Sequence, residues 1–77
     1  MPDQAVQGRV VSVNPPLRYV VMDFRLRNFP VLDQRLSVYR DGQKVGEVRV
    51  TGPILGTAAA GDIVAGQAQA GDEVRED

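Results

Sequence analysis

Apolar residues alternate with polar ones along much of this 77-residue chain, which is the two-residue period of β-strands. The clearest case is residues 36–51, LSVYRDGQKVGEVRVT, where two valine-containing runs flank Asp41-Gly42. Asp-Gly accepts positive φ at both central positions of a type I′ turn, the common two-residue connection of a β-hairpin. The pattern therefore predicts a hairpin that turns at Asp41-Gly42.

The second strand of this hairpin contains an irregularity. A two-residue loop would pair Val38 with Val45, and strict alternation would then send Val48 and Val50 to the opposite face. One extra residue at Gly46-Glu47 would bring the three valines of this strand to the same side. We therefore predict a β-bulge at Gly46-Glu47; the alternative is a glycine simply tolerated in an open strand, at a cost of about 0.5–1 kcal/mol relative to alanine.

Four further strands are predicted from β-favouring runs bounded by glycine and proline. Residues 25–34 form an irregular connection, and Gly52-Pro53 is predicted to be a turn. Residues 57–65 are ambiguous, because three alanines favour a helix whereas Ile63-Val64 favours a strand, and we predict a kinked strand. The predicted strands outside the hairpin are residues 8–13, 17–24, 57–65 and 72–75.

These strands predict an all-β fold, a small six-stranded barrel that is closed or partly open, of the cradle-loop or SH3-like kind. Closure suits so short a chain, because it removes exposed strand edges and uses the inner face of every strand. We assign residues 8–75 to one barrel domain, residues 1–7 to a disordered N-terminal tail, and residues 76–77 to a C-terminal tail.

The two halves of the chain resemble each other at an offset of 38 residues, where GRVVSVNPPL aligns with GEVRVTGPIL. Gly8, Val10, Pro15 and Leu17 match Gly46, Val48, Pro53 and Leu55. Such an alignment predicts an internal duplication with a pseudo-two-fold axis. Chance matching in a chain of narrow composition is the alternative.

The charged residues nearly balance, with nine basic and ten acidic side chains and a formal net charge of −1. A chain of this charge exerts little long-range attraction on nucleic acid or on anionic membranes. No apolar run reaches the roughly 18 residues of a membrane span. We therefore expect no direct membrane insertion, and we regard nucleic acid as a less favoured partner than protein.

The residue types needed for most enzyme mechanisms are missing, since the chain has neither histidine nor cysteine. Without them a nucleophile–base pair or a thiolate–metal site is nearly excluded. Asp62 and Asp72 each follow a glycine and could hold a cation or exchange protons, but Gly-Asp is also ordinary turn chemistry. No glycine-rich phosphate loop is present. We predict no catalytic, metal or cofactor site.

The strand predicted at residues 17–24 is apolar on both faces. One face fills the barrel interior, so the other needs a cover from a loop or a partner. We therefore predict a protein-interaction surface, for a second copy or for another domain of the same protein. Its members are Leu17, Tyr19, Val21 and the nearby Phe29.

An arginine-rich face offers an alternative, because small barrels bind single-stranded nucleic acid by stacking bases on aromatic rings within basic grooves. The balanced charge makes a solvated arginine rim the more favoured interpretation. The residues of this alternative face are Arg25, Arg27, Arg35 and Tyr39.

Five motifs follow one another along the chain: GRVVSV at 8–13, YVVMD at 19–23, LSVYRDGQKVGEVRV at 36–50, AAGDIV at 59–64 and GDEV at 71–74. Their order resembles a small β-barrel module of bacterial envelope-associated proteins, which often follows a coiled coil and is similar to the C-terminal barrel of a flagellar assembly protein. The resemblance implies a non-enzymatic assembly or interaction module in the periplasm or cell envelope. This chain departs from the family at residues 25–28, where the family has a glycine-containing turn.

Overall fold

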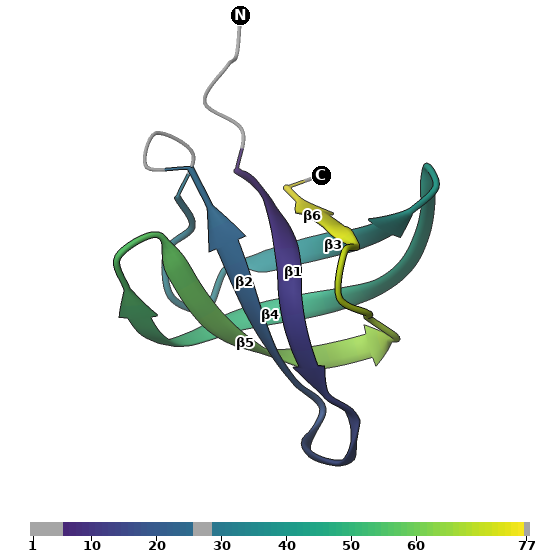
Figure 1. The fold of residues 1–77 in the computed structure, drawn as a ribbon, viewed down its shortest axis with the longest axis horizontal. Helices are drawn as coiled ribbons and strands as arrows, with labels where there is room; N and C mark the ends of the chain where they lie inside the picture. Colours follow the sequence, from purple (N-terminus) through teal and green to yellow (C-terminus); the bar gives the residue numbers. More distant parts are fainter. Residues whose placement is uncertain (1–5, 26–28, 77) are drawn as a thin grey trace, which may run out of the picture.

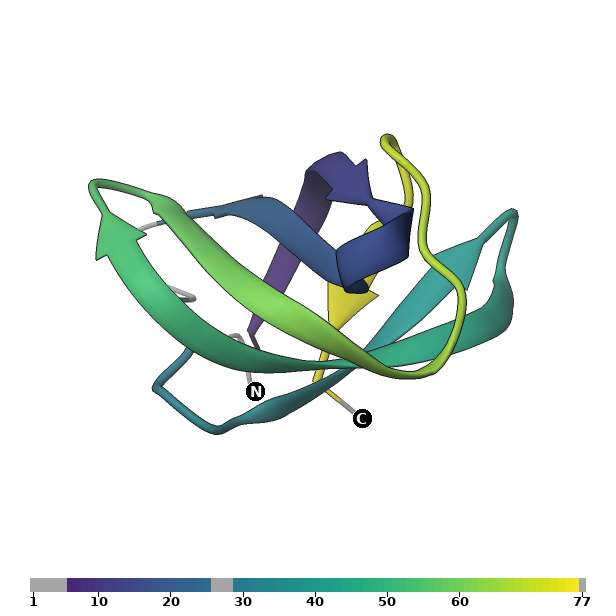
Figure 2. The same cartoon turned by 90° about the horizontal axis from the view of Figure 1, so that it is seen from below.

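The computed structural model describes residues 6–25 and 29–76. These residues form six β-strands and one short 3-10 helix, and the strands close into an antiparallel barrel in the order β1-β2-β5-β4-β3-β6 (Figure 1; Figure 2). The prediction of an all-β, six-stranded closed barrel is confirmed. The elements are β1 (Gln7–Asn14), η1 (Pro15–Leu17), β2 (Tyr19–Phe24), β3 (Arg35–Arg40), β4 (Gln43–Leu55), β5 (Ala58–Gly66) and β6 (Glu73–Arg75).

The barrel extends beyond both predicted ends of the domain. Strand β1 begins at Gln7 and Val6 is buried, whereas the sequence analysis placed both in the tail. The Val6 N–H donates to Oε1 of Glu76 (3.0 Å), and the Glu76 N–H donates to the Val6 carbonyl (3.1 Å). The pairing of β1 with β6 brings the two ends together, so these residues belong to the barrel. Residues 1–5 and 77 lie outside the described residues.

The central hairpin turns where it was predicted to turn, because Asp41 (φ 53°) and Gly42 (φ 80°) both have the positive φ of a type I′ turn. The bulge, however, lies one residue earlier than predicted. Val38 pairs with Gly46 and Tyr39 with Lys44, so Val45 is the extra residue. The predicted pairing of Val38 with Val45 is therefore wrong. The residue opposite Val38 must be a glycine, because a Cβ at Gly46 would clash with the Gln67 carbonyl oxygen.

Strand β4 continues past Gly52-Pro53, which was predicted to be a turn. The register shifts between Val50 and Ile54, and β4 resumes its pairing with β5 at Ile54 and Leu55. The chain reverses instead at Gly56-Thr57. Figure 1 shows this turn and the Asp41-Gly42 turn at opposite ends of the barrel.

Two other predicted strands differ in their limits. Leu17 lies in η1 rather than in β2, because the preceding Pro15-Pro16 cannot donate ladder hydrogen bonds and the chain then turns through Arg18 (φ 53°). The ambiguous segment 57–65 is a strand, as predicted, and forms β5. Residues 29–34 of the predicted irregular connection contain no helix or strand.

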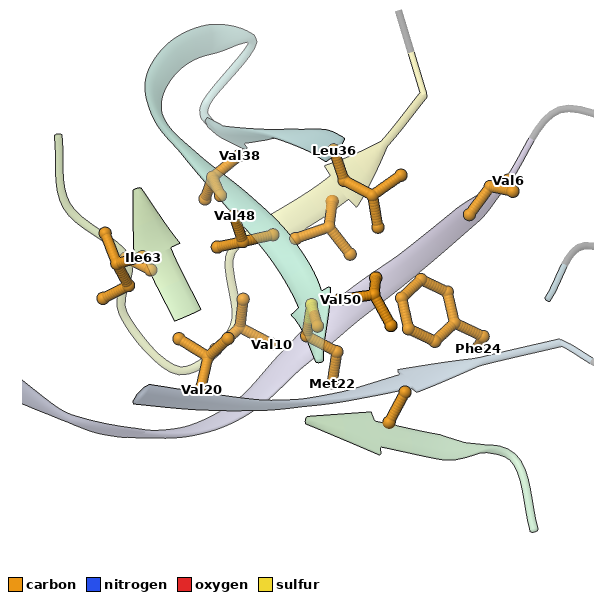
Figure 3. Packing of buried hydrophobic residues seen from close by; sticks show 13 residues of the cluster. Val6, Val10, Val20, Met22, Phe24, Leu36, Val38, Val48, Val50 and Ile63 are labelled. Atoms are coloured by element: carbon orange, nitrogen blue, oxygen red, sulfur yellow. The ribbon is translucent and has the colours of Figure 1, made fainter. Parts of the chain in front are cut away.

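The barrel interior is filled by aliphatic side chains from all six strands, as Figure 3 shows for most of them. Val20, Met22 and Phe24 of β2 point inward, and the ring of Phe29 meets that of Phe24 edge-on with 5.7 Å between centroids. The buried apolar residues that form the core are Val6, Val10, Val20, Met22, Phe24, Leu36, Val38, Val48, Val50, Ala59, Ile63, Ala68 and Val74.

The strand order has an internal symmetry. Exchanging β1 with β4, β2 with β5 and β3 with β6 leaves the cyclic order unchanged, because the β2–β5 and β3–β6 pairs then map onto themselves. This is the arrangement that two interleaved three-stranded halves produce.

Candidate protein-interaction groove

An apolar groove lies on the outer face of the barrel, across β2, β5 and the end of β4. It forms because Tyr19 and Val21 alternate with the inward residues of β2 and therefore face outward. Pairing places Val21 beside Ala60 of β5, and Ala58 of β5 beside Leu55 of β4. The groove is lined by Tyr19, Val21, Pro53, Leu55, Ala58, Ala59 and Ala60.

The groove has a floor of small side chains and walls of large ones. Ala58 and Ala60 form the floor on β5, between Tyr19 and Val21 of β2 on one side and Leu55 of β4 on the other. Two strand spacings separate β2 from β4, so the walls are about 10 Å apart. Ala60 is only 4% exposed although it faces outward, whereas Leu55 is 74% exposed and projects into solvent.

Charged residues stand at the two ends of the groove. Asp62 is paired with Tyr19 at one end, and Asp23 is paired with Ala58 towards the other. Asp23 accepts a hydrogen bond from the Thr57 hydroxyl (2.8 Å). Arg25 follows β2 at this second end and is exposed; within the described part of the chain, neither Arg25 nor Asp62 has a side-chain hydrogen bond or ion pair.

The structure brings together two of the four residues predicted to form an interaction surface. Tyr19 and Val21 line the groove. Leu17 is 72% exposed but lies in η1, before β2 begins, and it does not line the groove. Phe29 packs against Phe24 at the core, so it does not belong to this surface.

Pro53 and Leu55 of β4, which form one wall of the groove, were not among the residues predicted from the sequence. Pro53 and Leu55 stand two residues apart, which is the spacing of residues on one face of a strand. That signal was present in the sequence, but Gly52-Pro53 was interpreted as the point where the chain reverses. Extending the strand through the proline would have placed Leu55 on the same face.

The residues of the alternative basic face are not gathered into one site. Arg25 follows β2, whereas Arg35 and Tyr39 lie on β3, which is not a neighbour of β2 in the barrel. The Arg75 guanidinium covers the Tyr39 ring at 3.9 Å from the centroid, and Nη1 of Arg35 lies 3.8 Å from Oε2 of Glu47. Arg27 lies outside the described residues.

Asp72 is occupied by a structural ion pair. Its carboxylate is 4% exposed and accepts two hydrogen bonds from Arg40, both 2.9 Å long, and one from the Gln69 N–H (2.8 Å). The Arg40 hydrogen bonds hold the pKa of Asp72 below its ordinary value of 3.8; burial opposes this shift and the Gln69 N–H supports it. Asp62 lies on β5, and no group of three or more acidic, histidine or cysteine side chains suited to a metal occurs in residues 6–25 and 29–76.

The comparisons with other proteins give no further guide to this site. No family model, no curated protein and no solved structure matches the chain. Across the residues that the structure describes, no helix has the length and apolar character needed to cross a bilayer.

Proposed function

We propose that this chain is a non-enzymatic protein-interaction or assembly module, a domain of a larger bacterial envelope protein, and that it binds protein through the apolar groove. The observation that carries the proposal is the projecting Leu55 beside a nearly buried alanine floor on the outer surface of a closed barrel. Contiguous apolar surface of this kind commonly marks a binding site in soluble domains.

Barrel closure limits how a partner can bind. Each strand has a paired neighbour on both sides over part of its length, so no strand offers its whole edge to a partner strand that would extend the sheet. We therefore infer that the partner contacts side chains on the sheet face. A floor of alanines between two raised walls has room for one row of apolar side chains. A protein can supply such a row, and we therefore propose a protein ligand.

Other observations support the proposal that the chain is not an enzyme and that it works in the periplasm or cell envelope. The chain has no histidine or cysteine, and Arg40 already occupies the Asp72 carboxylate. The resemblance to envelope-associated barrels supports a periplasmic or envelope setting. An interaction module that works by groove contacts needs no reactive group.

The internal duplication is part of the proposal. The unchanged strand order on exchange of the halves supports it, together with the 38-residue offset between GRVVSVNPPL and GEVRVTGPIL. Sequences of related chains provide the test. We expect them to keep similar residues at Gly8 and Gly46, and at Val10 and Val48; independent variation of these pairs would contradict a duplication.

Site-specific photo-crosslinking tests the binding function. A photoreactive residue is placed at Leu55 in the protein in its native host, and a matched control carries it at Gln43, which is exposed at the opposite hairpin. We expect a protein adduct from Leu55 that disappears when Tyr19→Ser is added, and no adduct from Gln43. Equal adducts at both positions, or none at Leu55, would contradict the proposal.

A further inference from the structure

We propose that the turn at Asp41-Gly42 is a site of spontaneous backbone modification, at which Asp41 converts to isoaspartate through a cyclic succinimide. In this conversion a main-chain nitrogen attacks the side-chain carboxyl group of the preceding aspartate, and the attack is fast where the two groups are held close together. Among the aspartates of the chain, only Asp41 precedes a glycine. Because glycine has no side chain, it leaves the path to its nitrogen unhindered.

The reaction needs no reagent except water. The Gly42 nitrogen forms a bond to the carboxyl carbon Cγ of the protonated Asp41 side chain, and its proton leaves with the carboxyl hydroxyl as one water molecule. A water molecule then adds to one of the two ring carbonyl carbons and breaks the bond from that carbon to the nitrogen. Breaking the bond to Cγ restores aspartate, whereas breaking the bond to the main-chain carbonyl carbon gives isoaspartate. The product therefore has the same mass as the original chain.

Both reacting groups at this turn lie in solvent without partners. Asp41 and Gly42 are exposed, and a Cβ added at Gly42 would meet nothing within 4 Å. Across residues 6–25 and 29–76, no acceptor holds the Gly42 N–H, and no hydrogen bond or ion pair holds the Asp41 carboxylate. Exposed turns open locally at a low cost in free energy, which lets the nitrogen reach Cγ.

The other described aspartates are protected by hydrogen bonds. The main-chain nitrogen that follows Asp23, Asp33 or Asp62 already donates a hydrogen bond, which it would have to lose before reacting. At Asp72 the carboxylate itself is occupied by two hydrogen bonds from Arg40. The main-chain bonds run from Phe24 to the Thr57 oxygen (2.9 Å), from Gln34 to that of Val31 (3.2 Å) and from Ile63 to that of Arg18 (2.8 Å).

The conversion changes the hairpin that contains it. Isoaspartate carries the main chain through its Cβ and Cγ, so one extra atom enters the connection between Arg40 and Gln43, which pair across the hairpin. A type I′ turn fits two ordinary residues with positive φ, as Asp41 and Gly42 have here. The longer connection no longer matches that turn, and it lies next to the Arg40 side chain that holds Asp72. We therefore expect isoaspartate to make the barrel less stable.

An asparagine substitution tests whether the folded turn is reactive. Asp41→Asn forms the same succinimide with loss of ammonia, and Asn-Gly also suits a type I′ turn, so the fold is kept. Asp33→Asn is the matched control, because Asp33 is likewise exposed with positive φ (71°) but precedes Gln34. Mass spectrometry follows deamidation at neutral pH, and circular dichroism checks that both variants stay folded. We expect Asp41→Asn to deamidate at least about tenfold faster than Asp33→Asn; equal rates would overturn the proposal.

The original chain provides the direct test. It is incubated at neutral pH and cleaved into peptides, and electron-transfer fragmentation in the mass spectrometer distinguishes isoaspartate from aspartate. We expect isoaspartate to accumulate at Asp41 ahead of Asp23, Asp33 and Asp62; its absence at Asp41, or equal amounts at these positions, would overturn the site. The isoaspartate form, separated by chromatography, should melt at a lower temperature than the original chain. Equal melting temperatures would overturn the effect on the hairpin.

Discussion

The ion pair between Asp72 and Arg40 should be the polar contact on which barrel stability depends most. Asp72 stands at the end of the link between β5 and β6, and its carboxylate accepts three hydrogen bonds, two from Arg40 and one from the Gln69 N–H. Its backbone carbonyl accepts from the Val10 N–H (2.8 Å). The residue therefore joins the link to β1 and β3 at one point.

The size of the effect follows from the burial of the two partners. Breaking a fully buried ion pair costs about 3–5 kcal/mol because the remaining charge is left unpaired in the interior. Here the Asp72 side chain is 4% exposed but that of Arg40 is 32% exposed, so the guanidinium regains water when its partner is removed. We therefore expect Asp72→Ala to lower the free energy of unfolding by about 2–3 kcal/mol, and the melting temperature by about 10–20 °C.

Urea and thermal denaturation, followed by circular dichroism, measure this effect. Asp72→Asn and Asp33→Asn form a matched pair of charge removals, because Asp33 is 79% exposed and reaches Arg49 only at 3.5 Å. We expect Asp33→Asn to change stability by less than about 0.5 kcal/mol and Asp72→Asn to cost clearly more. Equal effects of the two substitutions would refute the reasoning.

The same ion pair fixes the direction of the pH dependence. The pKa of Asp72 is lowered in the folded protein from its ordinary value of 3.8, so its stabilising contribution is complete above that value and is lost as the pH falls through the lower, folded pKa. The stability gap between the original chain and Asp72→Asn should therefore be constant near neutrality and shrink below about pH 4. A gap that persists unchanged into strong acid would contradict the ionised pair.

Three further predictions use the same denaturation assay. Gly46→Ala should destabilise the barrel by more than about 2 kcal/mol, because a Cβ there would clash with the Gln67 carbonyl oxygen. Gly56→Ala has open space around the added Cβ but a φ of 61°, and it should cost only about 1 kcal/mol; a reversed order would contradict the close approach at Gly46. Met22→Ala should cost about 2–5 kcal/mol because Met22 is fully buried, and a loss below 1 kcal/mol would mean that the core is loosely packed. Leu55→Ser should change stability by less than about 0.5 kcal/mol because the side chain is largely exposed; a larger loss would mean that Leu55 supports the fold rather than binding.

Features that depend on neighbouring residues could be predicted from the sequence. The turn at Asp41-Gly42 follows from the backbone freedom of those two residues, and the two-sided apolar pattern of β2 identified Tyr19 and Val21 as outward residues. Alternation together with short length was enough to predict a closed barrel.

Features that depend on distant contacts could not be predicted. The bulge falls at Val45 because the backbone of Gln67 approaches Gly46, more than twenty residues away. Ala60 is buried on the outer face only because β2 lies beside β5, and Val6 is buried only because β1 pairs with β6. The groove exists because β4 continues through Pro53 to Leu55, which together form one of its walls.

The central claim is that the outer groove is where this barrel contacts protein, and photo-crosslinking at Leu55 in the native host tests it most directly. We expect the Leu55 probe to yield a defined protein adduct, with the linked peptide identified by mass spectrometry, and Tyr19→Ser to remove it. A Leu55 probe that remains unlinked while the Gln43 probe forms adducts would contradict the claim.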